Sequence, residues 1–307
     1  MPRPLTNRPI ELFPIISTLK PKIWKSRLAY AKRYCNPRLT PWGWDFRGAS
    51  NLDELHKILK STCMVRYTTK QVLTTLPGKN RRVIVLDILN RDDYVEAEKN
   101  FLHWLKLNYP ERYEKSIKAA ALVQIGVLLR LAAKKKLKFA VDYINKFIEQ
   151  NPKRRIVVYA IHKKCLAALK RRINAKSAII DGSTPHNKRR EIITAFRAGR
   201  LTVLIANILA AGVGINLQVS DTMFVLELPF KPGPLLQVEG RIHRLGQSMV
   251  SNINYLIAKN TIEEKLIKLI QSKEQTIATV LDGKNSADLN LLELLLKELY
   301  DQHSRSA

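Results

Sequence analysis

The second half of the chain alternates short apolar runs with amphipathic helical stretches. The runs rich in β-branched and aliphatic residues are "RIVVYA" (155–160), "SAII" (177–180), "TVLIA" (202–206), "TMFVLEL" (222–228) and "INYLIA" (253–258). Strands that alternate with helices in this way form a parallel sheet with crossover helices. The sequence therefore predicts an α/β fold, in which ligands bind in the loops that follow the carboxyl ends of the strands.

The first 150 residues show a different pattern, because they are mainly helical and rich in basic and aromatic residues. One strand-like run, "RRVIVLDIL" (81–89), follows the breaker "LPGK". The tryptophans of "PWGWD", Trp42 and Trp44, have side chains that suit stacking on bases. Aromatic residues beside proline pack more often in a local core, and we expect a core position for both.

Positive charge dominates the composition. The 307 residues contain 53 Lys and Arg against 26 Asp and Glu, which gives a formal net charge of +27. This balance predicts a polyanionic partner, and nucleic acid is the first candidate. A membrane partner is not expected, because the most apolar helical stretch, "AAALVQIGVLLRLAA" (119–133), is too short to span and contains Gln124 and Arg130.

Neither secretion nor a bound metal ion is expected. The first residues lack the pattern of a secretory signal. Cys35, Cys63 and Cys165 fit neither a zinc-ligand spacing nor a disulfide framework. We therefore expect an intracellular, DNA-associated protein, in the cytoplasm or nucleoid, or in the nucleus if the source is eukaryotic.

Two arginines three residues apart, Arg241 and Arg244, lie in "QVEGRIHRLGQ" (237–247). The stretch is predicted to be helical, so both side chains share one face of the helix. Two planar guanidinium groups that point the same way suit a phosphate, which each binds in a bidentate manner. The alternative is a solvated basic face, which is the usual role of such turns.

A glycine-containing loop follows the third predicted strand in "ANILAAGVGINLQ" (206–218). Gly212 and Gly214 let backbone N–H groups approach a ligand closely, and Asn216 and Gln218 add side-chain donors. A plain tight turn is the alternative. We expect this loop and the paired arginines to lie on the same edge of the sheet.

Other basic clusters are candidates for contacts with nucleic-acid phosphates, although a solvated surface is an equal alternative. They are "KKKLK" (134–138), Lys163 with Lys164, "KRR" (170–172) and "KRR" (188–190). At the end of the second predicted strand, Asp181-Gly182-Ser183 either offers a hydroxyl and backbone donors to a phosphate or only caps the next helix.

The order of "VVYAIHKK", "IIDGST", "AAGVGINL" and "QVEGRIHRLGQ" resembles the second RecA-like lobe of superfamily-two helicase-like ATPases, specifically the Swi/Snf class of DNA translocases. Earlier, "LTNRPIELFPIISTLKP", "RYCNPRLTPWGWDFRGASNLDELH" and "LTTLPGKNRRVIVL" resemble the segment that follows the first lobe's last motif in the annealing-helicase (HARP-like) branch. The resemblance extends from residue 5 to about residue 283.

The resemblance implies four segments. They are a helical remnant that follows the first-lobe motifs (1–88), a helical linker or protrusion (89–150), a RecA-like helicase C-terminal lobe (151–285) and a C-terminal helical tail (286–307).

The resemblance also implies site residues. ATP lies in a cleft between two lobes in this family, and Arg241 and Arg244 occupy the positions of arginine fingers that reach across it. Gln237 begins that motif, and Gly212 and Gly214 belong to the loop that couples the nucleotide to DNA. The DNA-binding positions that we expect are His162, Lys163, Asp181, Gly182, Ser183, Asn207 and Asn216.

The sequence departs from the family pattern in several places. Gly240 stands where this class usually has an acidic residue, and Asn207 stands where serine is frequent. The 307 residues contain no GxxxxGK[ST] phosphate loop and no DExH-type motif that directly follows a predicted strand, since the letters DELH (53–56) do not follow an apolar run. We therefore expect no ATP hydrolysis by this chain alone, and ATP with magnesium bound mainly by a partner first lobe.

The leading hypothesis is the second half of an ATP-dependent DNA translocase that needs a separately encoded first lobe, as a split or truncated gene would produce. Two alternatives stay open. One is a nucleic-acid-binding module without ATPase activity, and the other is a regulatory fragment that takes the partner's place on a complete relative.

Overall fold

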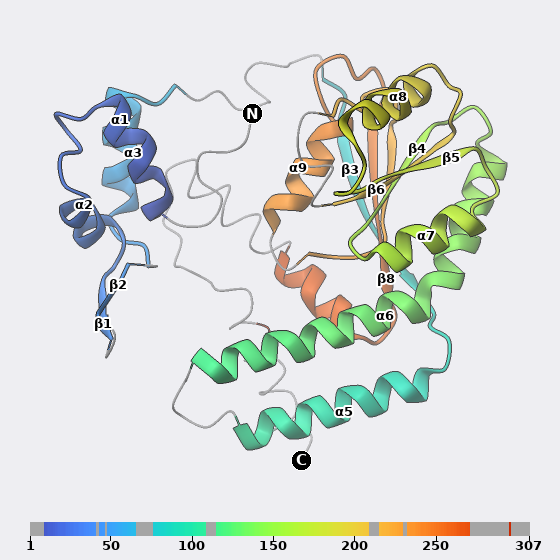
Figure 1. Cartoon of the computed structure of the whole chain (residues 1–307), viewed down its shortest axis with the longest axis horizontal. Coiled ribbons are helices and arrows are strands. Elements are labelled where there is room, and N and C mark those ends of the chain that lie inside the picture. The colour runs from blue at the N-terminus through green and yellow to red at the C-terminus, as the bar shows by residue number, and fades with distance from the viewer. Residues whose placement is uncertain are drawn as a thin grey trace. The chain divides into compact units, whose positions relative to one another are not determined.

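The computed structural model describes residues 9–40, 43–46, 48–65, 76–108, 115–208, 215–229, 232–270 and 295. Among these, the residues up to 65 form one compact unit, and those from 76 to 270, together with Leu295, form a second (Figure 1).

The smaller unit is built around a core of aromatic residues. Its elements are η1 (Pro9–Leu12), α1 (Phe13–Leu19), α2 (Arg27–Tyr34), β1 (Arg38–Thr40), β2 (Gly43–Asp45) and α3 (Leu52–Thr62). The ring of Trp24 packs edge-on against Tyr30 at 5.6 Å between centroids. Arg33 donates two hydrogen bonds of 2.7 Å to Glu54, which joins α2 to α3.

Trp44 lies on the surface of the smaller unit, so the prediction of a core position is wrong for this residue. Its side chain is 52% exposed and stacks on Phe46 with an interplanar angle of 17°. It lies directly across the β1–β2 pair from Leu39, and a two-stranded sheet offers little on either face to cover such side chains. Trp42 lies outside the described residues.

The larger unit contains a six-stranded sheet in which every pair of neighbours is parallel. Its strands are β3 (Lys79–Leu86), β4 (Ile156–Ala160), β5 (Ser177–Ile180), β6 (Val203–Asn207), β7 (Thr222–Val225) and β8 (Ser251–Ala258), in the order β3-β8-β7-β4-β6-β5. The predicted parallel α/β fold is therefore confirmed. The run at 81–89 adds an edge strand, because β3 pairs with β8 along its whole length.

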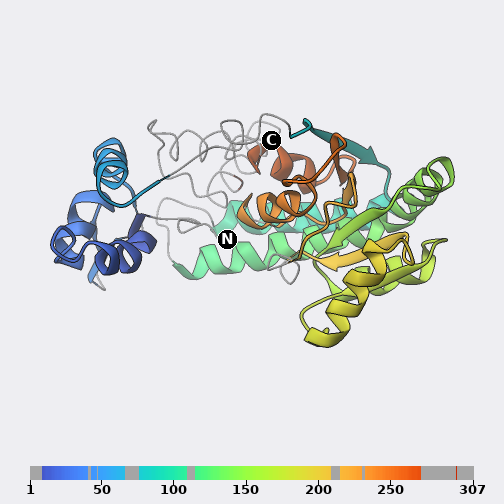
Figure 2. The same cartoon turned by 90° about the horizontal axis from the view of Figure 1, so that it is seen from above.

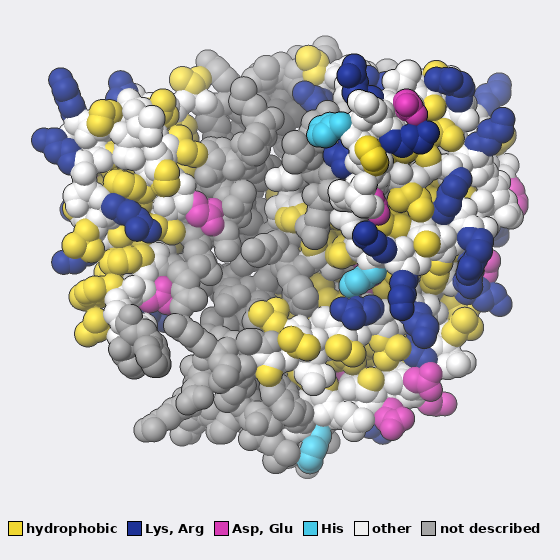
Figure 3. Space-filling view, in the orientation of Figure 1, with side chains coloured by type: hydrophobic (Ala, Val, Ile, Leu, Met, Phe, Trp, Pro, Cys, Tyr) yellow, Lys and Arg dark blue, Asp and Glu magenta, His cyan; other side chains and the backbone are white. Residues whose placement is uncertain are grey.

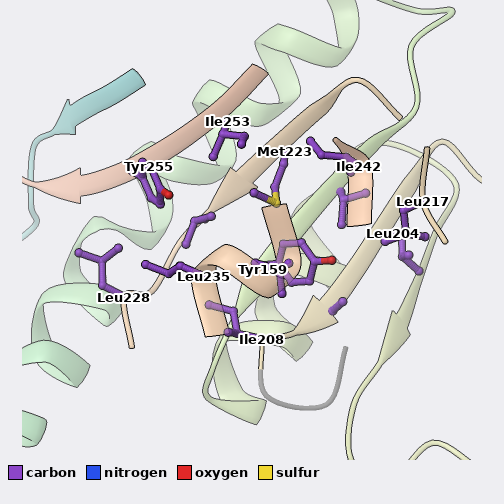
Figure 4. Packing of buried hydrophobic residues seen from close by; sticks show 14 of the residues in the cluster. Tyr159, Leu204, Ile208, Leu217, Met223, Leu228, Leu235, Ile242, Ile253 and Tyr255 are labelled. Carbon is purple, nitrogen blue, oxygen red and sulfur yellow. The ribbon is translucent and has the colours of Figure 1, made fainter. Parts of the chain in front are cut away.

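Helices cover both faces of this sheet. They are α5 (Arg91–Asn108), α6 (Lys115–Gln150), α7 (Lys163–Arg172), α8 (His186–Arg197), α9 (Pro232–Ile242) and residues 262–270. Alternate strand residues point to opposite faces. Val157 and Tyr159 pack with α8, α9 and residues 262–270, whereas Ile156 and Val158 pack with α6 and α7. Figure 4 shows the first of these two cores around Tyr159, Leu235 and Ile242.

Helices α5 and α6 lie side by side as a hairpin between β3 and β4 (Figures 1 and 2). Tyr94 and Phe101 of α5 pack against Ile125 and Leu128 of α6. No helix in the described parts of the chain is both long and apolar enough to cross a membrane.

The basic run at 134–138 lies in the middle of α6, and two of its lysines are buried. Lys136 is fully buried and binds Glu263 with Nζ–oxygen distances of 2.8 and 2.6 Å. Lys135 donates to Asp93 at 2.6 Å and to the Asn90 carbonyl oxygen at 2.7 Å. The sequence analysis predicted either contacts with nucleic-acid phosphates or a solvated surface for this run. Both predictions are wrong for Lys135 and Lys136, because their side chains join α6 to neighbouring elements.

Candidate functional site

The end of α9 carries the paired arginines. The helix ends at Ile242, so Arg241 lies in its last turn and Arg244 lies beyond it. The prediction that one helix face presents both is therefore wrong. Arg241 is half-buried and Arg244 is exposed. Burial lowers the pKa of Arg241, the hydroxyl of Tyr159 opposes this shift, and the positive charge of Arg244 acts in the same direction as burial.

The end of α9 is fixed by a glutamine. Gln247 Nε2 donates to the carbonyl oxygens of Ile242, Gln218 and Ser220 at 3.1, 3.1 and 3.0 Å. The backbone N–H of Leu217 donates to the Arg241 carbonyl at 3.0 Å. Because side-chain and backbone donors occupy these carbonyls, the helix stops here and Arg241 lies beside residues 217–220.

The paired arginines lie at the amino edge of the sheet, where the described end of the glycine-containing loop, Leu217 and Gln218, lies beside them. Helix α9 follows β7 and runs back toward the amino ends of the strands (Figure 1). His243 Nε2 donates to the carbonyl of Pro77, which precedes β3, and Gln247 binds Ser220, which precedes β7. Arg244 lies between these two anchored residues. Gly212 and Gly214 lie outside the described residues, and Gln237 is half-buried within α9.

A buried carboxylate, Glu239, fastens α9 to the neighbouring strands. Lys79 and Arg81 of β3 and Tyr255 of β8 all donate to it. Burial opposes ionisation, but the hydrogen bond from Arg81 and the positive charge of Lys79 keep the pKa of Glu239 below its usual value. Sequence reasoning missed this contact, because Lys79 and Glu239 are 160 positions apart.

A second polar cluster lies at the carboxyl ends of β4, β6 and β7. Glu227 accepts hydrogen bonds from the backbone N–H groups of Ile161 and His162, at 2.7 and 2.8 Å, and from His162 Nδ1 at 2.5 Å. Asn207 Nδ2 donates to the Ile161 carbonyl at 2.6 Å. These contacts fix His162 at the N-terminal end of α7, next to the exposed Lys163. Glu227 is a further residue that the sequence reasoning missed.

A cysteine beside this cluster is chemically inert. Burial raises the pKa of Cys165 to about 12, and the charge and hydrogen bond of Glu227 act in the same direction. The thiolate, which is the reactive form of cysteine, is therefore disfavoured at neutral pH.

Asp181-Gly182-Ser183 forms a closed turn at the end of β5. Asp181 Oδ1 accepts from the Ser183 N–H at 2.9 Å, from its hydroxyl at 2.7 Å and from Thr184 Oγ1 at 3.0 Å. The hydrogen bond from the Ser183 hydroxyl is the main reason why the pKa of Asp181 is lowered. Helix α8 begins after Pro185 without a side-chain cap, so of the two alternatives for this segment, the one in which it caps the helix is wrong.

The structure brings some of the predicted DNA-binding residues together and separates others. His162, Asn207 and Asp181 end the adjacent strands β4, β6 and β5, so they lie in a row along the carboxyl edge of the sheet. Asn216 lies apart from this row, with its side chain bound to Gln218 at 3.1 Å.

Exposed Lys and Arg side chains gather over α7 and α8, which cover opposite faces of the sheet on either side of the edge strand β5 (Figure 3). The exposed cations of these helices are Lys163, Lys164, Lys170, Arg171, Arg172, Lys188, Arg190 and Arg197. One of these cations, Lys188, forms an ion pair within its own helix, with Glu191 at 3.0 Å. The cluster gives this surface a positive charge that suits a phosphate backbone.

Two family models match this chain. The SNF2-related domain matches residues 3–133, and the helicase conserved C-terminal domain matches residues 135–246. The second match contains the end of α9 and the row of residues at the carboxyl edge.

Curated relatives cover nearly the whole chain. The SWI/SNF-related matrix-associated actin-dependent regulator of chromatin subfamily A-like protein 1 of Xenopus tropicalis is 29% identical over 99% of this chain and 33% of its own length. The DNA annealing helicase and endonuclease ZRANB3 of Mus musculus is 35% identical over 92% of this chain and 27% of its own length. The chain therefore spans a third or less of these relatives.

Solved structures share the fold. The C-terminal part of the Fun30 ATPase domain gives a TM-score of 0.57 at 17% identity, and covers 75% of this chain and 99% of that chain. The Sulfolobus solfataricus SWI2/SNF2 ATPase core in complex with dsDNA gives a TM-score of 0.57 at 18% identity, and covers 94% of this chain and 62% of that chain. Both support a RecA-like parallel-sheet lobe.

Proposed function

Because this chain belongs to the Swi/Snf class of helicase-like proteins, in its annealing-helicase branch, we propose that it supplies the second lobe of an ATP-dependent DNA translocase. In this role Arg241 and Arg244 act as arginine fingers on ATP. Gln237, Gly212 and Gly214 lie in the motifs that contact the nucleotide and couple it to DNA.

The observation that carries this proposal is the arrangement at the end of α9. Arg241 is half-buried in the last turn of α9, and Arg244 is exposed three residues later, in the segment that His243 and Gln247 anchor to the residues before β3 and β7. Two neighbouring positive charges, one of them partly removed from water, are stabilised when an anion binds both. A triphosphate that transfers its terminal phosphoryl group offers such an anion, and its charge spreads over equatorial oxygens in the transition state.

The remaining parts of the ATP site come from a first lobe. The 307 residues contain no phosphate loop, and their one DExH-like tetrapeptide, Asp53–His56, lies at the start of helix α3 instead of following a strand of the sheet. In this proposal, the groups that hold the β- and γ-phosphates and magnesium therefore lie on another polypeptide region. We propose that a separate first-lobe polypeptide supplies them and that ATP with magnesium binds mainly to that partner.

DNA binds, in this proposal, to the positive surface over α7 and α8 and to the row at the carboxyl edge. His162 and Lys163 lie at the start of α7, and Asp181, Gly182 and Ser183 lie at the end of β5. In this proposal Asn207 contacts DNA from the row, and Asn216 contacts it from beside Arg197 of α8, which donates to the Asn216 carbonyl; each of the two amides also binds within the chain. Contacts of this kind bind phosphates without reading sequence. The protein is accordingly DNA-associated.

Reconstitution tests the proposal. The chain is mixed with a first-lobe polypeptide that carries a phosphate loop and a DExH-type motif, with and without duplex or forked DNA. ATP turnover should appear only in the mixture and should rise with DNA. Turnover by the pure chain would reveal a site within these residues, and an inactive mixture of two polypeptides that bind each other would contradict the translocase.

A second function, nucleic-acid binding without ATPase activity, is favoured by one observation. The exposed cations over α7 and α8 are available to DNA phosphates without any contribution from a first lobe. If this second function is correct, the chain binds DNA equally well with or without a first-lobe polypeptide, and the mixture of the two does not hydrolyse ATP. The same reconstitution experiment therefore separates the two functions.

A further inference from the structure

Glu239 is buried in the middle of four hydrogen bonds. Lys79 Nζ donates to Oε2 at 2.7 Å, Arg81 donates to both oxygens at 2.8 and 2.6 Å, and Tyr255 Oη donates to Oε1 at 2.5 Å. The Glu239 side chain is only 1% exposed. A carboxylate removed from water in this way is stable only because its partners neutralise it.

We infer that Glu239 is a positioning residue for the arginine fingers: its contacts with Lys79 and Arg81 set the position and rotation of α9 relative to the sheet. The inference rests on the proposed function, because it assigns Glu239 a role in the reaction of Arg241 and Arg244. Glu239 itself contacts neither ATP nor DNA in the proposed function, so its role goes beyond the residues assigned there.

The helix geometry supports this role. Glu239 binds Lys79 and Arg81 of β3, and His243 Nε2 donates at 2.9 Å to the carbonyl of Pro77, which precedes β3, so both side chains face this strand. Arg241 is two residues from Glu239, so it points to another side of the helix. Holding the first face against β3 therefore fixes the direction of Arg241.

The same contacts tie α9 to the first strand of the larger unit. The Gly78 carbonyl accepts from the Ser251 N–H at 3.0 Å, so residues 77–81 are held by both β8 and α9. A salt bridge on one side and a backbone pairing on the other leave little freedom for α9 to rotate. We call this set of contacts, Glu239 with Lys79, Arg81 and Tyr255, the β3–α9 latch.

Removing the charge of Glu239 should release the latch without creating a cavity. Glu239→Gln keeps the shape of the side chain and takes away the negative charge that binds Lys79 and Arg81. Glu263→Gln is the matched control, since Glu263 is also 1% exposed and ion-paired, but with Lys136 of α6. Both variants lose a buried ion pair, and only one of them contacts α9.

The reconstituted pair provides the first measurement. A misplacement of about 1 Å at a reacting group costs about 100-fold in rate, so kcat of Glu239→Gln should fall by about 10- to 100-fold. KM for ATP should change by less than about threefold, because the first lobe provides most of the binding groups. Arg81→Gln, which breaks the latch from β3, should lower kcat in the same way. Glu263→Gln, compared per folded molecule, should keep kcat.

Hydrogen exchange of the chain alone provides the second measurement and needs no ATPase activity. The amides of residues 239–247 should exchange faster in Glu239→Gln than in the wild type, and those of β4 should not change. Glu263→Gln should leave 239–247 unchanged.

These outcomes separate the inference from the proposed function. If the wild-type pair has no turnover, the proposed function fails. Wild-type turnover in Glu239→Gln, or an equal loss in Glu263→Gln, overturns the positioning role. Unchanged exchange at 239–247 overturns the latch itself.

Discussion

Replacement of Lys136 by methionine should destabilise the larger unit strongly, although this residue was read from the sequence as a surface cation. Lys136 is 0% exposed and its partner Glu263 is 1% exposed. Methionine leaves the Glu263 carboxylate buried with one remaining donor, the backbone N–H of Ala258 at 2.8 Å. Loss of one partner of a buried ion pair costs about 3–5 kcal/mol, and we expect a value in this range.

The neighbouring lysine gives a matched control. Lys135 also forms an ion pair in α6, but its partner Asp93 is 67% exposed and remains solvated when the lysine is removed. Solvated pairs of this kind contribute about 0–1 kcal/mol, so Lys135→Met should cost at most about 1 kcal/mol. The double variant Lys136→Met/Glu263→Gln should be more stable than Lys136→Met alone, because it removes the unpaired charge.

Equilibrium urea unfolding, followed by far-UV circular dichroism, measures these differences from the transition midpoints and slopes. Equal losses for Lys135→Met and Lys136→Met would refute the reasoning, as would a loss below about 1 kcal/mol for Lys136→Met. DNA affinity of the folded Lys136→Met protein should equal that of the wild type, since a buried lysine cannot reach a phosphate.

Three further predictions concern the surface, the latch and the end of α9. The affinity of the isolated chain for duplex DNA should fall steeply with salt and vary little with sequence, and a filter-binding titration showing salt-independent affinity would contradict this. Because the pKa of Glu239 is lowered in the folded protein, the ionised carboxylate stabilises the fold fully above the usual glutamate pKa of 4.5, and this stabilisation is lost as the pH falls through the lower folded value. The difference in unfolding free energy between the wild type and Glu239→Gln should therefore be constant above pH 4.5 and should become smaller only below it, as measured by urea unfolding at each pH. Gln247→Ala leaves the Ile242, Gln218 and Ser220 carbonyls without its amide and should cost about 1–3 kcal/mol in the same urea assay, whereas a neutral effect would show that water replaces the amide.

Local patterns in the sequence were sufficient to predict the sheet. Each predicted apolar run overlaps a strand, because a fully buried parallel strand is apolar on both faces and so appears as a continuous run. The run 222–228 was predicted to be longer than β7, which ends at Val225. Leu226 and Glu227 follow it, and Glu227 turns to the loops of β4 instead of continuing the ladder.

Contacts between distant residues were not predictable from such patterns. Glu239 meets Lys79 only because β3 pairs with β8, and no periodicity in the sequence reports that pairing. The same holds for Glu227 and His162, which are 65 positions apart. Polar residues of this kind are recognised only when the strand order is known.

One of the errors had a signal in the sequence that could have prevented it. Lys136 lies four residues from both Ala132 and Ala140, which are buried, so helical periodicity places it on the apolar face of α6. A second error was the prediction that the stretch 237–247, and so Arg244, is helical. The helix ends at Ile242, where the Gln247 side chain binds the Ile242 carbonyl, and sequence periodicity does not report that contact.

The most direct test of the second-lobe function is the ATP turnover of Arg244 variants in the reconstituted pair, measured beside their DNA affinity. Arginine fingers contribute about three to five decades in turnover, so Arg244→Ala should nearly abolish hydrolysis, and Arg241→Ala should do the same. Arg244→Lys should restore little, because an ammonium group lacks the planar bidentate geometry. DNA affinity should stay close to that of the wild type, since one positive charge is removed from a net charge of +27. Wild-type turnover in Arg244→Ala, or a loss of DNA binding in proportion to the loss of ATPase, would show that this segment is a basic docking surface and not part of an ATP site.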